Sequence, residues 1–136
     1  MICLDTNAAI AAMNPREPGV RTKLERALRD GVTVGVSTIA LFELWYGISK
    51  NTRRANNIRQ LAAFLALGLE QWAFEAADAQ DAGEIRTSLE RAGTAIGPYD
   101  LLIAAQARRR GAVLITANSR EFARVPGLKF VDWCLD

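Results

Sequence analysis

The chain contains no histidine among its 136 residues, and this absence removes several common catalytic schemes. Ser-His-Asp hydrolysis, Cys-His proteolysis and two-histidine acid–base catalysis all need an imidazole. A glycine-rich loop of the P-loop type and a dinucleotide-binding fingerprint are also missing, so a nucleotide-driven switch or a dehydrogenase has no support. Any catalysis must use other side chains, and carboxylates are what remain.

Cysteines and membrane signals are equally scarce. Cys3 and Cys134 lie near opposite ends of the chain, without the short spacings of a zinc site or a disulfide framework, so we expect buried or incidental thiols. The first residues lack the basic leader and the apolar run of a signal peptide. The weakly charged stretch 32–49 has Glu43 inside it and a break around residues 35–38, which argues against a membrane span. We expect a cytoplasmic protein with no membrane segment.

The bulk composition is that of an ordinary globular protein. Half of the residues are hydrophobic and 24% are charged, and a chain of 136 residues predicts one domain over 1–136 with a real core. The net charge is only +2, so a surface for nucleic acid would have to be local. Arginine far outnumbers lysine, which suits forked contacts with phosphate or carboxylate, although a compositional bias explains it equally well.

Short apolar runs alternate with helical patterns along the chain. We expect strands at 2–4, 32–36, 69–74, 113–115 and, as an edge strand, 128–133. Helices are expected after residue 5, after 37–38, and over 52–67, 75–92, 97–110 and, briefly, 116–122. The strands are too short and apolar to have one solvent face, which favours an α/β fold with a parallel sheet between layers of helices.

In such a sheet the working site lies at the carboxyl ends of the strands, and two acids are placed there or just beyond. Asp5 ends the first strand, although an aspartate there could equally be a helix N-cap. Glu43 stands between Phe42 and Leu44 in an otherwise apolar helix, where an ionised glutamate is costly unless it has a partner. The alternative for Glu43 is an exposed strip of the helix. We favour a functional role for it.

Two further polar groups complete the predicted site. Asp100 falls in the first turn of its helix, where the helix dipole stabilises its charged form, although acids there often only stabilise the helix. Thr116, Asn118 and Glu121 follow the strand 113–115 and form a fourth polar corner. An ordinary capped turn explains this corner as well, with Glu121 paired to its neighbour Arg120.

Several acids meeting at one place would create a strongly negative site that is untenable without bound cations. Ligands that are all oxygen favour Mg²⁺ or Mn²⁺. Such an ion bridges to phosphate, activates water and stabilises a leaving oxygen. The predicted reaction is therefore metal-dependent phosphodiester cleavage.

The order of the motifs resembles that of PIN-domain ribonucleases, in particular VapC-type toxins of bacterial toxin–antitoxin pairs. The segments that carry this resemblance span almost the whole chain and are Met1 to Asn7, Ser37 to Gly47, Ile85 to Gly93, Ile96 to Ala105, Thr116 to Phe122, and Val125 to Trp133. The resemblance implies a PIN-like α/β/α sandwich with a short, mainly parallel sheet. It also implies Mg²⁺-dependent endoribonuclease activity, with Mn²⁺ as a plausible substitute, a VapB-type antitoxin that blocks the site, and a homodimer.

The same resemblance assigns roles to residues. Asp5, Glu43 and Asp100 coincide with the acidic positions of the family and are the expected metal ligands and catalytic residues, with Asn7 beside them. Many PIN domains have a fourth aspartate where this chain has Asn118, so Glu121 is the expected catalytic substitute. With that weaker corner, we expect one metal on Asp5 and Asp100, and a second recruited by RNA phosphate.

The segment 96–100 resembles that of VapC toxins which cut initiator tRNA in its anticodon loop. For contacts with such an RNA, Tyr99 and the arginines are the candidates, namely Arg53, Arg54, Arg108, Arg109 and Arg110. A solvated helix end that complements the dipole explains the arginine triplet as well.

Two other functions stay open at this stage. One is a non-catalytic PIN-fold module that binds RNA or a protein, and the other is a metal-dependent DNA nuclease or phosphatase. The presence of all three acids favours an enzyme, because a binding module has no need for clustered carboxylates. RNA is favoured over DNA by resemblance alone.

Overall fold

The structure, a computed structural model, describes residues 1–135 and has a five-stranded sheet at its centre. The strands are β1 (Ile2–Leu4), β2 (Val34–Ser37), β3 (Glu70–Trp72), β4 (Val113–Ile115) and β5 (Lys129–Val131). They lie in the order β3-β2-β1-β4-β5, and all four pairings are parallel. The last residue of the domain predicted for 1–136 lies outside the described range.

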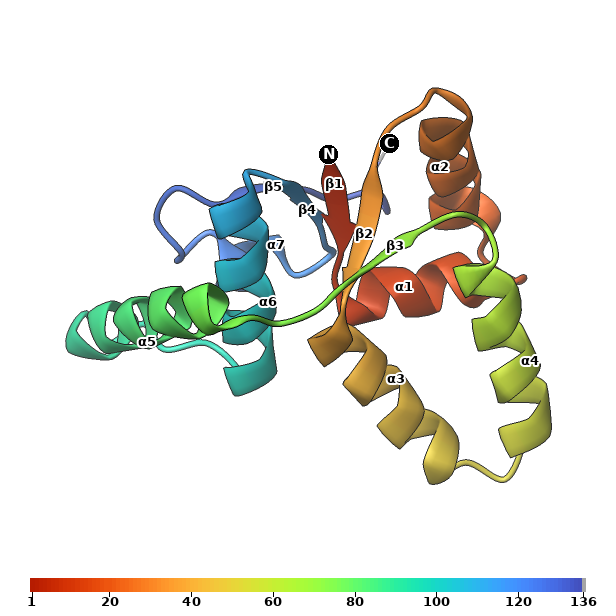
Figure 1. Cartoon of the computed structure of the whole chain (residues 1–136), viewed down its shortest axis with the longest axis horizontal. Helices are drawn as coiled ribbons and strands as arrows, with labels where there is room; N and C mark the ends of the chain where they lie inside the picture. Colours follow the sequence, from red (N-terminus) through yellow and green to blue (C-terminus); the bar gives the residue numbers. More distant parts are fainter. Residues whose placement is uncertain (136) are drawn as a thin grey trace.

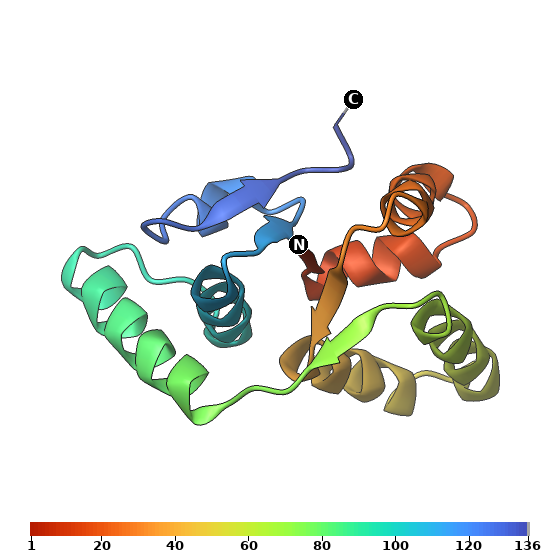
Figure 2. The ribbon, with the colours of Figure 1, turned by 45° about the horizontal axis from the view of Figure 1, so that its top comes forward.

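Helices cover both faces of this sheet. The first face carries α1 (Thr6–Met13), α2 (Pro18–Arg29), α3 (Thr38–Ser49) and α4 (Arg54–Leu65). The second carries α5 (Ala76–Arg91), α6 (Pro98–Arg110) and the short α7 (Ser119–Phe122). Figure 2 shows the two groups on opposite sides of the strands. The α/β/α sandwich with a parallel sheet is therefore confirmed.

The three central strands are largely buried. β2 is buried at all four positions, and Leu4 and Leu114 are fully buried in β1 and β4. Gly35 in β2 allows an unusually close approach: a Cβ built there would lie 2.1 Å from Cε2 of Trp72 in β3. The indole thus occupies the space above the backbone of β2, which only glycine leaves open.

Helix ends follow the local sequence. Ser37 caps α3 by accepting a hydrogen bond of 3.1 Å from the Ile39 amide. Pro98 occupies the first turn of α6, and Gly111 ends that helix with a φ of 68°, a left-handed conformation suited to glycine. These signals explain why the predicted limits of α6 agree with the structure.

The strand order reverses at β1, because β2 and β3 extend the sheet on one side and β4 and β5 on the other. In parallel sheets the crevice at such a switch point is where ligands bind. In Figure 1 the carboxyl ends of β1 and β2 lie at the lower edge of the sheet, where α1, α3 and α6 begin. The predicted site residues come from these segments.

Several predictions needed correction. Residues 18–29 form α2, a helix for which we had no prediction, and residues 32 and 33 lie outside β2. The predicted edge strand is shorter than expected, although β5 does lie at one edge.

Both cysteines are free, Cys3 buried and Cys134 exposed, as expected for unpaired thiols. None of the helices in residues 1–135 is long and apolar enough to cross a membrane.

Candidate active site

Asp5 lies at the carboxyl end of β1 and is almost completely buried, with 3% of its surface exposed. Its Oδ1 accepts a hydrogen bond of 2.7 Å from the Ala8 amide, so Asp5 is also the N-cap of α1. Burial raises the pKa of the Asp5 carboxyl. Hydrogen bonds from Thr116 and Ala8 oppose that rise, and the charges of Glu43 and Asp132 add to it. The N-cap alternative is therefore real, and it coexists with a position inside the acidic site.

Glu43 lies in the middle of α3 and is held by a residue of α1. The Thr6 hydroxyl donates a hydrogen bond of 2.7 Å to Oε1 of Glu43. The alternative of an exposed strip is correct in part, since Glu43 is half-buried and Phe42 and Tyr46 on the same helix are exposed. The partner that this acid was expected to need is thus a neutral hydroxyl.

Asp100 lies in the first turn of α6, as expected, and is half-buried. Burial raises the pKa of Asp100 to about 6, and three neighbouring carboxylates raise it further: Glu121, Asp5 and Glu43. Asp100 is therefore close enough to all three acids to be affected by their charge. The four acids form one electrostatic cluster, although they come from positions far apart in the sequence.

Glu121 is held on both of its oxygens. Oε1 accepts a hydrogen bond of 2.6 Å from the Gly97 amide, and Oε2 accepts one of 2.5 Å from the Asn118 side chain. These two bonds, the one from Gly97 first, lower the pKa of Glu121. Gly97 precedes α6, and a Cβ built on it would lie 3.4 Å from Oδ2 of Asp100. Glu121 thus fixes the backbone beside Asp100. Arg120 forms no ion pair with it in the described chain.

Thr116 and Asn118 complete this corner. Thr116 is buried, and besides its bond to Asp5 its hydroxyl accepts a hydrogen bond of 2.9 Å from the Asn118 amide. Asn118 in turn donates to Glu121. A continuous chain of hydrogen bonds therefore runs from Asp5 to Gly97, at the start of α6.

The four carboxylates have the donor chemistry that a hard divalent cation requires. All donors are oxygen, and none of the ion pairs among residues 1–135 neutralises them. Within the same residues, no three acids are grouped closely enough to hold one ion as they stand. The set fits a metal by charge and ligand type, and an ion would have to draw the side chains closer together.

Other predicted residues lie at the margin of the site or outside it. Asn7 is exposed and has no hydrogen bond from its side chain among residues 1–135. Tyr99 is 44% exposed next to Asp100, and its ring lies 5.5 Å from that of Phe42 on α3. Tyr99 therefore borders the acids, whereas Asn7 forms no bond with them.

The arginine triplet, which was predicted as a candidate for RNA contact, lies away from the four acids. Arg109 forms an ion pair of 2.5 Å with the buried Asp78 on α5, and Arg108 donates a hydrogen bond of 3.0 Å to the carbonyl of Pro126. The Arg110 guanidinium stacks 4.5 Å from the ring centroid of Trp72. All three lie at the opposite end of α6 from Asp100, about 12 to 15 Å along the helix axis at about 1.5 Å per residue. They secure α6 to its neighbours.

Two residues that contribute to the site were not predicted. Thr6 holds Glu43 through its hydroxyl, and Gly97 holds Glu121 through its amide. Thr6 could have been found as the hydroxyl that directly follows Asp5. Nothing in the sequence marks the Gly97 amide, because a backbone group carries no side-chain signal.

Comparison with known proteins agrees with this geometry. A family model described as "PIN domain" matches residues 2–128. The tRNA(fMet)-specific endonuclease VapC of Salmonella typhimurium is 37% identical over 131 residues, covering 96% of each chain. Ribonuclease VapC2 of Rickettsia felis is 39% identical over 130 residues, with the same coverage. The crystal structure of VapBC2 from Rickettsia felis, bound to a DNA fragment from their promoter, contains a chain that superposes with a TM-score of 0.91 at 39% identity, covering 98% of this chain and 99% of that one.

A parallel sheet between helices, with coupled carboxylates at its switch point, places the chain in the α/β/α class with an acidic site. The chain belongs to the PIN-domain family and, within it, to the VapC ribonucleases. Ribonucleases of this family are generally metal-dependent, in keeping with the oxygen-only site described above.

Proposed function

We propose that this protein is the toxin of a VapBC-type toxin–antitoxin pair and an endoribonuclease that uses Mg²⁺, with Mn²⁺ as a substitute. The observation that carries the proposal is the coupling of Asp100 to Glu121, Asp5 and Glu43, because acids that repel one another, and that no ion pair among residues 1–135 neutralises, are costly unless a cation binds between them. We take residues 1–136 as one nuclease domain. A cytoplasmic location is part of the proposal, since the RNA substrate is there.

Asp5, Glu43 and Asp100 are the proposed metal ligands. When bound, a divalent ion supplies positive charge to the scissile phosphate and lowers the pKa of a water molecule. The protein's own residues prepare the site for it. Thr6 orients Glu43, and the backbone amide of Ala8 and the hydroxyl of Thr116 keep the buried Asp5 available as an anion.

Glu121 has a different part in this proposal. Because Gly97 and Asn118 already use both of its oxygens, we assign it to positioning the first turn of α6 and to adding negative charge beside Asp100. It thereby takes the place of a fourth acidic ligand without having to bind the ion directly. The products are a 5′-phosphate and a 3′-hydroxyl, since water attacks the phosphorus and the 3′-oxygen leaves.

The proposed substrate is initiator tRNA, cut in the anticodon loop, because the relative from Salmonella typhimurium is a tRNA(fMet)-specific endonuclease. The exposed Tyr99, next to Asp100, is placed to stack on a base of a splayed loop. The test is to incubate the protein with Mg²⁺ and transcripts of initiator tRNA, an elongator methionine tRNA and a third tRNA. Cleavage confined to the first supports the assignment, and equal cleavage of all three contradicts it.

The proposed partners are a VapB-type antitoxin and a second copy of this chain. The solved relative from Rickettsia felis is a VapBC complex, which supports the first of these. Co-expression of the cognate VapB-type antitoxin with this chain should give a complex that no longer cleaves RNA. Cleavage at the full rate by that complex would contradict the antitoxin assignment, and light scattering measures whether the free toxin is a dimer.

A further inference from the structure

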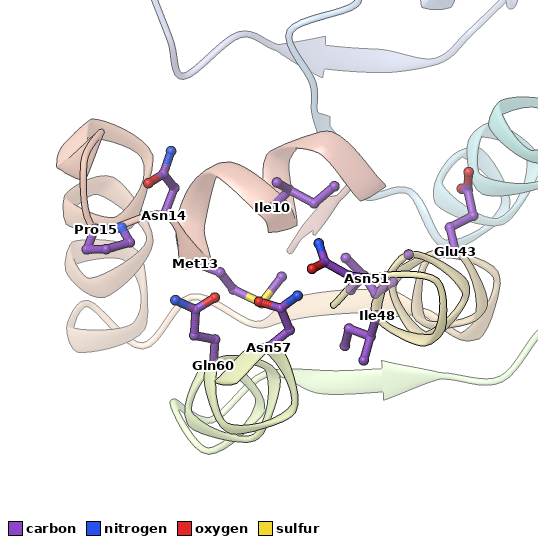
Figure 3. A pocket seen from close by; sticks show the side chains of 11 residues that line it. Ile10, Met13, Asn14, Pro15, Glu43, Ile48, Asn51, Asn57 and Gln60 are labelled. Atoms are coloured by element: carbon purple, nitrogen blue, oxygen red, sulfur yellow. The ribbon is translucent and has the colours of Figure 1, made fainter. Parts of the chain in front are cut away.

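A pocket of about 370 Å³ lies between α1, α3 and α4, beside the acidic site and separate from its hydrogen-bond chain. Apolar side chains from two helices form part of its wall, among them Ile10, Met13 and Ile48. Figure 3 shows Glu43 at one end of the lining, with Asn14, Pro15 and Gln60 toward the other end. The pocket therefore begins at a proposed metal ligand and leads away from it, and its size suits one small ligand.

Two of the polar groups in this pocket are asparagines whose orientation is fixed. Oδ1 of Asn14 accepts a hydrogen bond of 3.0 Å from the Arg16 amide, and Oδ1 of Asn51 accepts one of 2.9 Å from the Arg53 amide. Each side-chain oxygen thus accepts a hydrogen bond within its own loop and stabilises a turn there. The Nδ2 groups of both residues have no acceptor within residues 1–135, so they remain as donors for a ligand.

Asn57 and Gln60 supply two more carboxamides from α4. They are three residues apart, which places them on the same side of the helix, and both are half-buried in the lining. Figure 3 shows them close to Met13. Neither side chain has a hydrogen-bond partner in the described part of the chain. The pocket thus combines apolar walls with four carboxamides that have unused donors or acceptors.

The chain beside the pocket is rich in positive charge. Arg16 and Arg53 belong to the two turns just described, and Arg54 begins α4. All three are exposed, and none forms an ion pair within residues 1–135. The acids nearest in sequence to the lining are Glu17 and the lining residue Glu43 itself. The rim therefore suits an anionic ligand, with Glu43 at the catalytic end.

We propose that this pocket binds one nucleobase of the RNA substrate, next to the phosphate that is cut. The inference rests on the proposed ribonuclease function and explains how the enzyme would prefer one base of its RNA substrate over the others. The side chains of Ile10, Met13 and Ile48 would contact the faces of the ring, and a carboxamide can donate to and accept from a base edge at once. The exposed arginines would contact flanking phosphates.

The test uses the full chain with Asp100→Asn, which we expect to bind RNA and to cut it at least about 100-fold more slowly. The probes are four single-stranded heptaribonucleotides of uridine whose central base is A, C, G or U, and fluorescence anisotropy measures each affinity. We expect one central base to bind at least threefold more tightly than the others. Adding Asn57→Ala or Gln60→Ala should weaken that oligonucleotide about fivefold or more and remove the preference. Gln80→Ala on α5, an exposed carboxamide outside this pocket, is the matched control and should change nothing.

NMR of the side-chain amide signals gives a second readout. The preferred oligonucleotide should shift the NH₂ signals of the pocket residues Asn14, Asn51, Asn57 and Gln60, and thermal melting confirms that the variants stay folded. Equal affinities for all four oligonucleotides, or unchanged affinity in both pocket variants, overturns the proposal. So does a result in which the pocket variants lose only the antitoxin, because the pocket is then a protein-docking site. If the unmodified chain fails to cleave any RNA with Mg²⁺, the proposed function fails instead.

Discussion

The hydroxyl of Thr6 donates a hydrogen bond of 2.7 Å to Oε1 of Glu43, and this bond joins the first turn of α1 to the middle of α3. Thr6 directly follows Asp5, which caps the same helix through the Ala8 amide. Two acids from separate strand–helix units are therefore fixed relative to each other by one short segment. The precision of the acidic cluster depends on this bond as well as on the acids.

Replacing Thr6 with valine keeps the shape of the side chain and removes the hydroxyl. We expect Thr6→Val to lower the rate of RNA cleavage about tenfold, because a charge-assisted hydrogen bond that orients a ligand is worth roughly 1.5 kcal/mol. Thr6→Ser keeps the donor and should stay within about twofold of the original rate. Single-turnover cleavage of one RNA measures both. Equal rates for the valine and serine variants would show that the bond has no positioning role.

The raised pKa of Asp100 predicts a pH-dependent cost to folding in the absence of metal. A carboxyl whose pKa rises from 3.8 to about 6 on folding holds its proton more tightly when folded. The stability that it contributes is thus present at low pH and lost as pH rises from about 4 to above 6. Asp100→Asn should therefore stabilise the metal-free protein at pH 8 by about 1 kcal/mol, after allowance for solvent screening, and have little effect near pH 4.5.

Urea denaturation in EDTA at pH 4.5, 6 and 8 measures this difference. Glu84→Gln on α5 is the control, because Glu84 is exposed and forms no ion pair in the described chain. Its effect should not vary with pH. Mg²⁺ should stabilise the unmodified protein at pH 8 more than the Asp100→Asn variant. A variant that is less stable than the original at every pH would contradict the electrostatic coupling of the four acids.

Substitutions of Glu121 distinguish a role in positioning α6 from direct binding of the metal. Glu121→Gln keeps an oxygen that can accept the bond from the Gly97 amide, whereas Glu121→Ala leaves that amide and Asn118 without their acceptor. We expect the alanine variant to lose roughly 1 to 3 kcal/mol of stability and most activity, and the glutamine variant to keep most of both. Titration with Mn²⁺, followed by electron paramagnetic resonance, should give similar affinities for the glutamine variant and the original. A large loss of Mn²⁺ affinity on Glu121→Gln would identify Glu121 as a ligand.

Gly35 and Trp72 test the packing of the sheet. A Cβ on Gly35 would lie 2.1 Å from the indole, so Gly35→Ala must displace a ring that Arg110 also covers. We expect a loss of about 2 to 3 kcal/mol in the free energy of unfolding. In a Trp72→Leu background the added methyl group has more room, and its further cost should be smaller. Equal costs in the two backgrounds, measured by urea denaturation, would contradict this account of the close approach.

The sequence predicted the fold well where pattern and end signals coincide. For α6, Pro98 in the first turn and Gly111 past the end agree with a strongly apolar helix. Residues 18–29 were missed although α2 is amphipathic, with Val20 and Leu24 buried, because no side-chain cap marks where this helix begins. The central strands are largely buried, so their sequences lack the alternation of apolar and polar residues that a strand with one solvent face shows. That pattern predicted a parallel sheet.

The candidate site was only partly predictable. Asp5 and Asp100 could be chosen because a strand end and a helix start are visible in sequence, and both belong to the coupled cluster. The bond between Thr6 and Glu43 spans 37 residues, and no local pattern reports such a pairing. The intramolecular contacts of the arginine triplet were unpredictable for the same reason, since their partners on α5, β3 and the loop before β5 are remote in sequence.

The most direct test of the central claim is the cleavage of total RNA by the purified protein with Mg²⁺, compared with EDTA and with Asp100→Asn and Glu84→Gln. We predict cleavage by the unmodified chain and by Glu84→Gln, leaving 5′-phosphate and 3′-hydroxyl ends. EDTA should abolish it, and Asp100→Asn should reduce it by at least about 100-fold, the loss expected when several kcal/mol of charge stabilisation is removed. Cleavage that persists in EDTA and in Asp100→Asn would contradict a metal-dependent site built from these carboxylates.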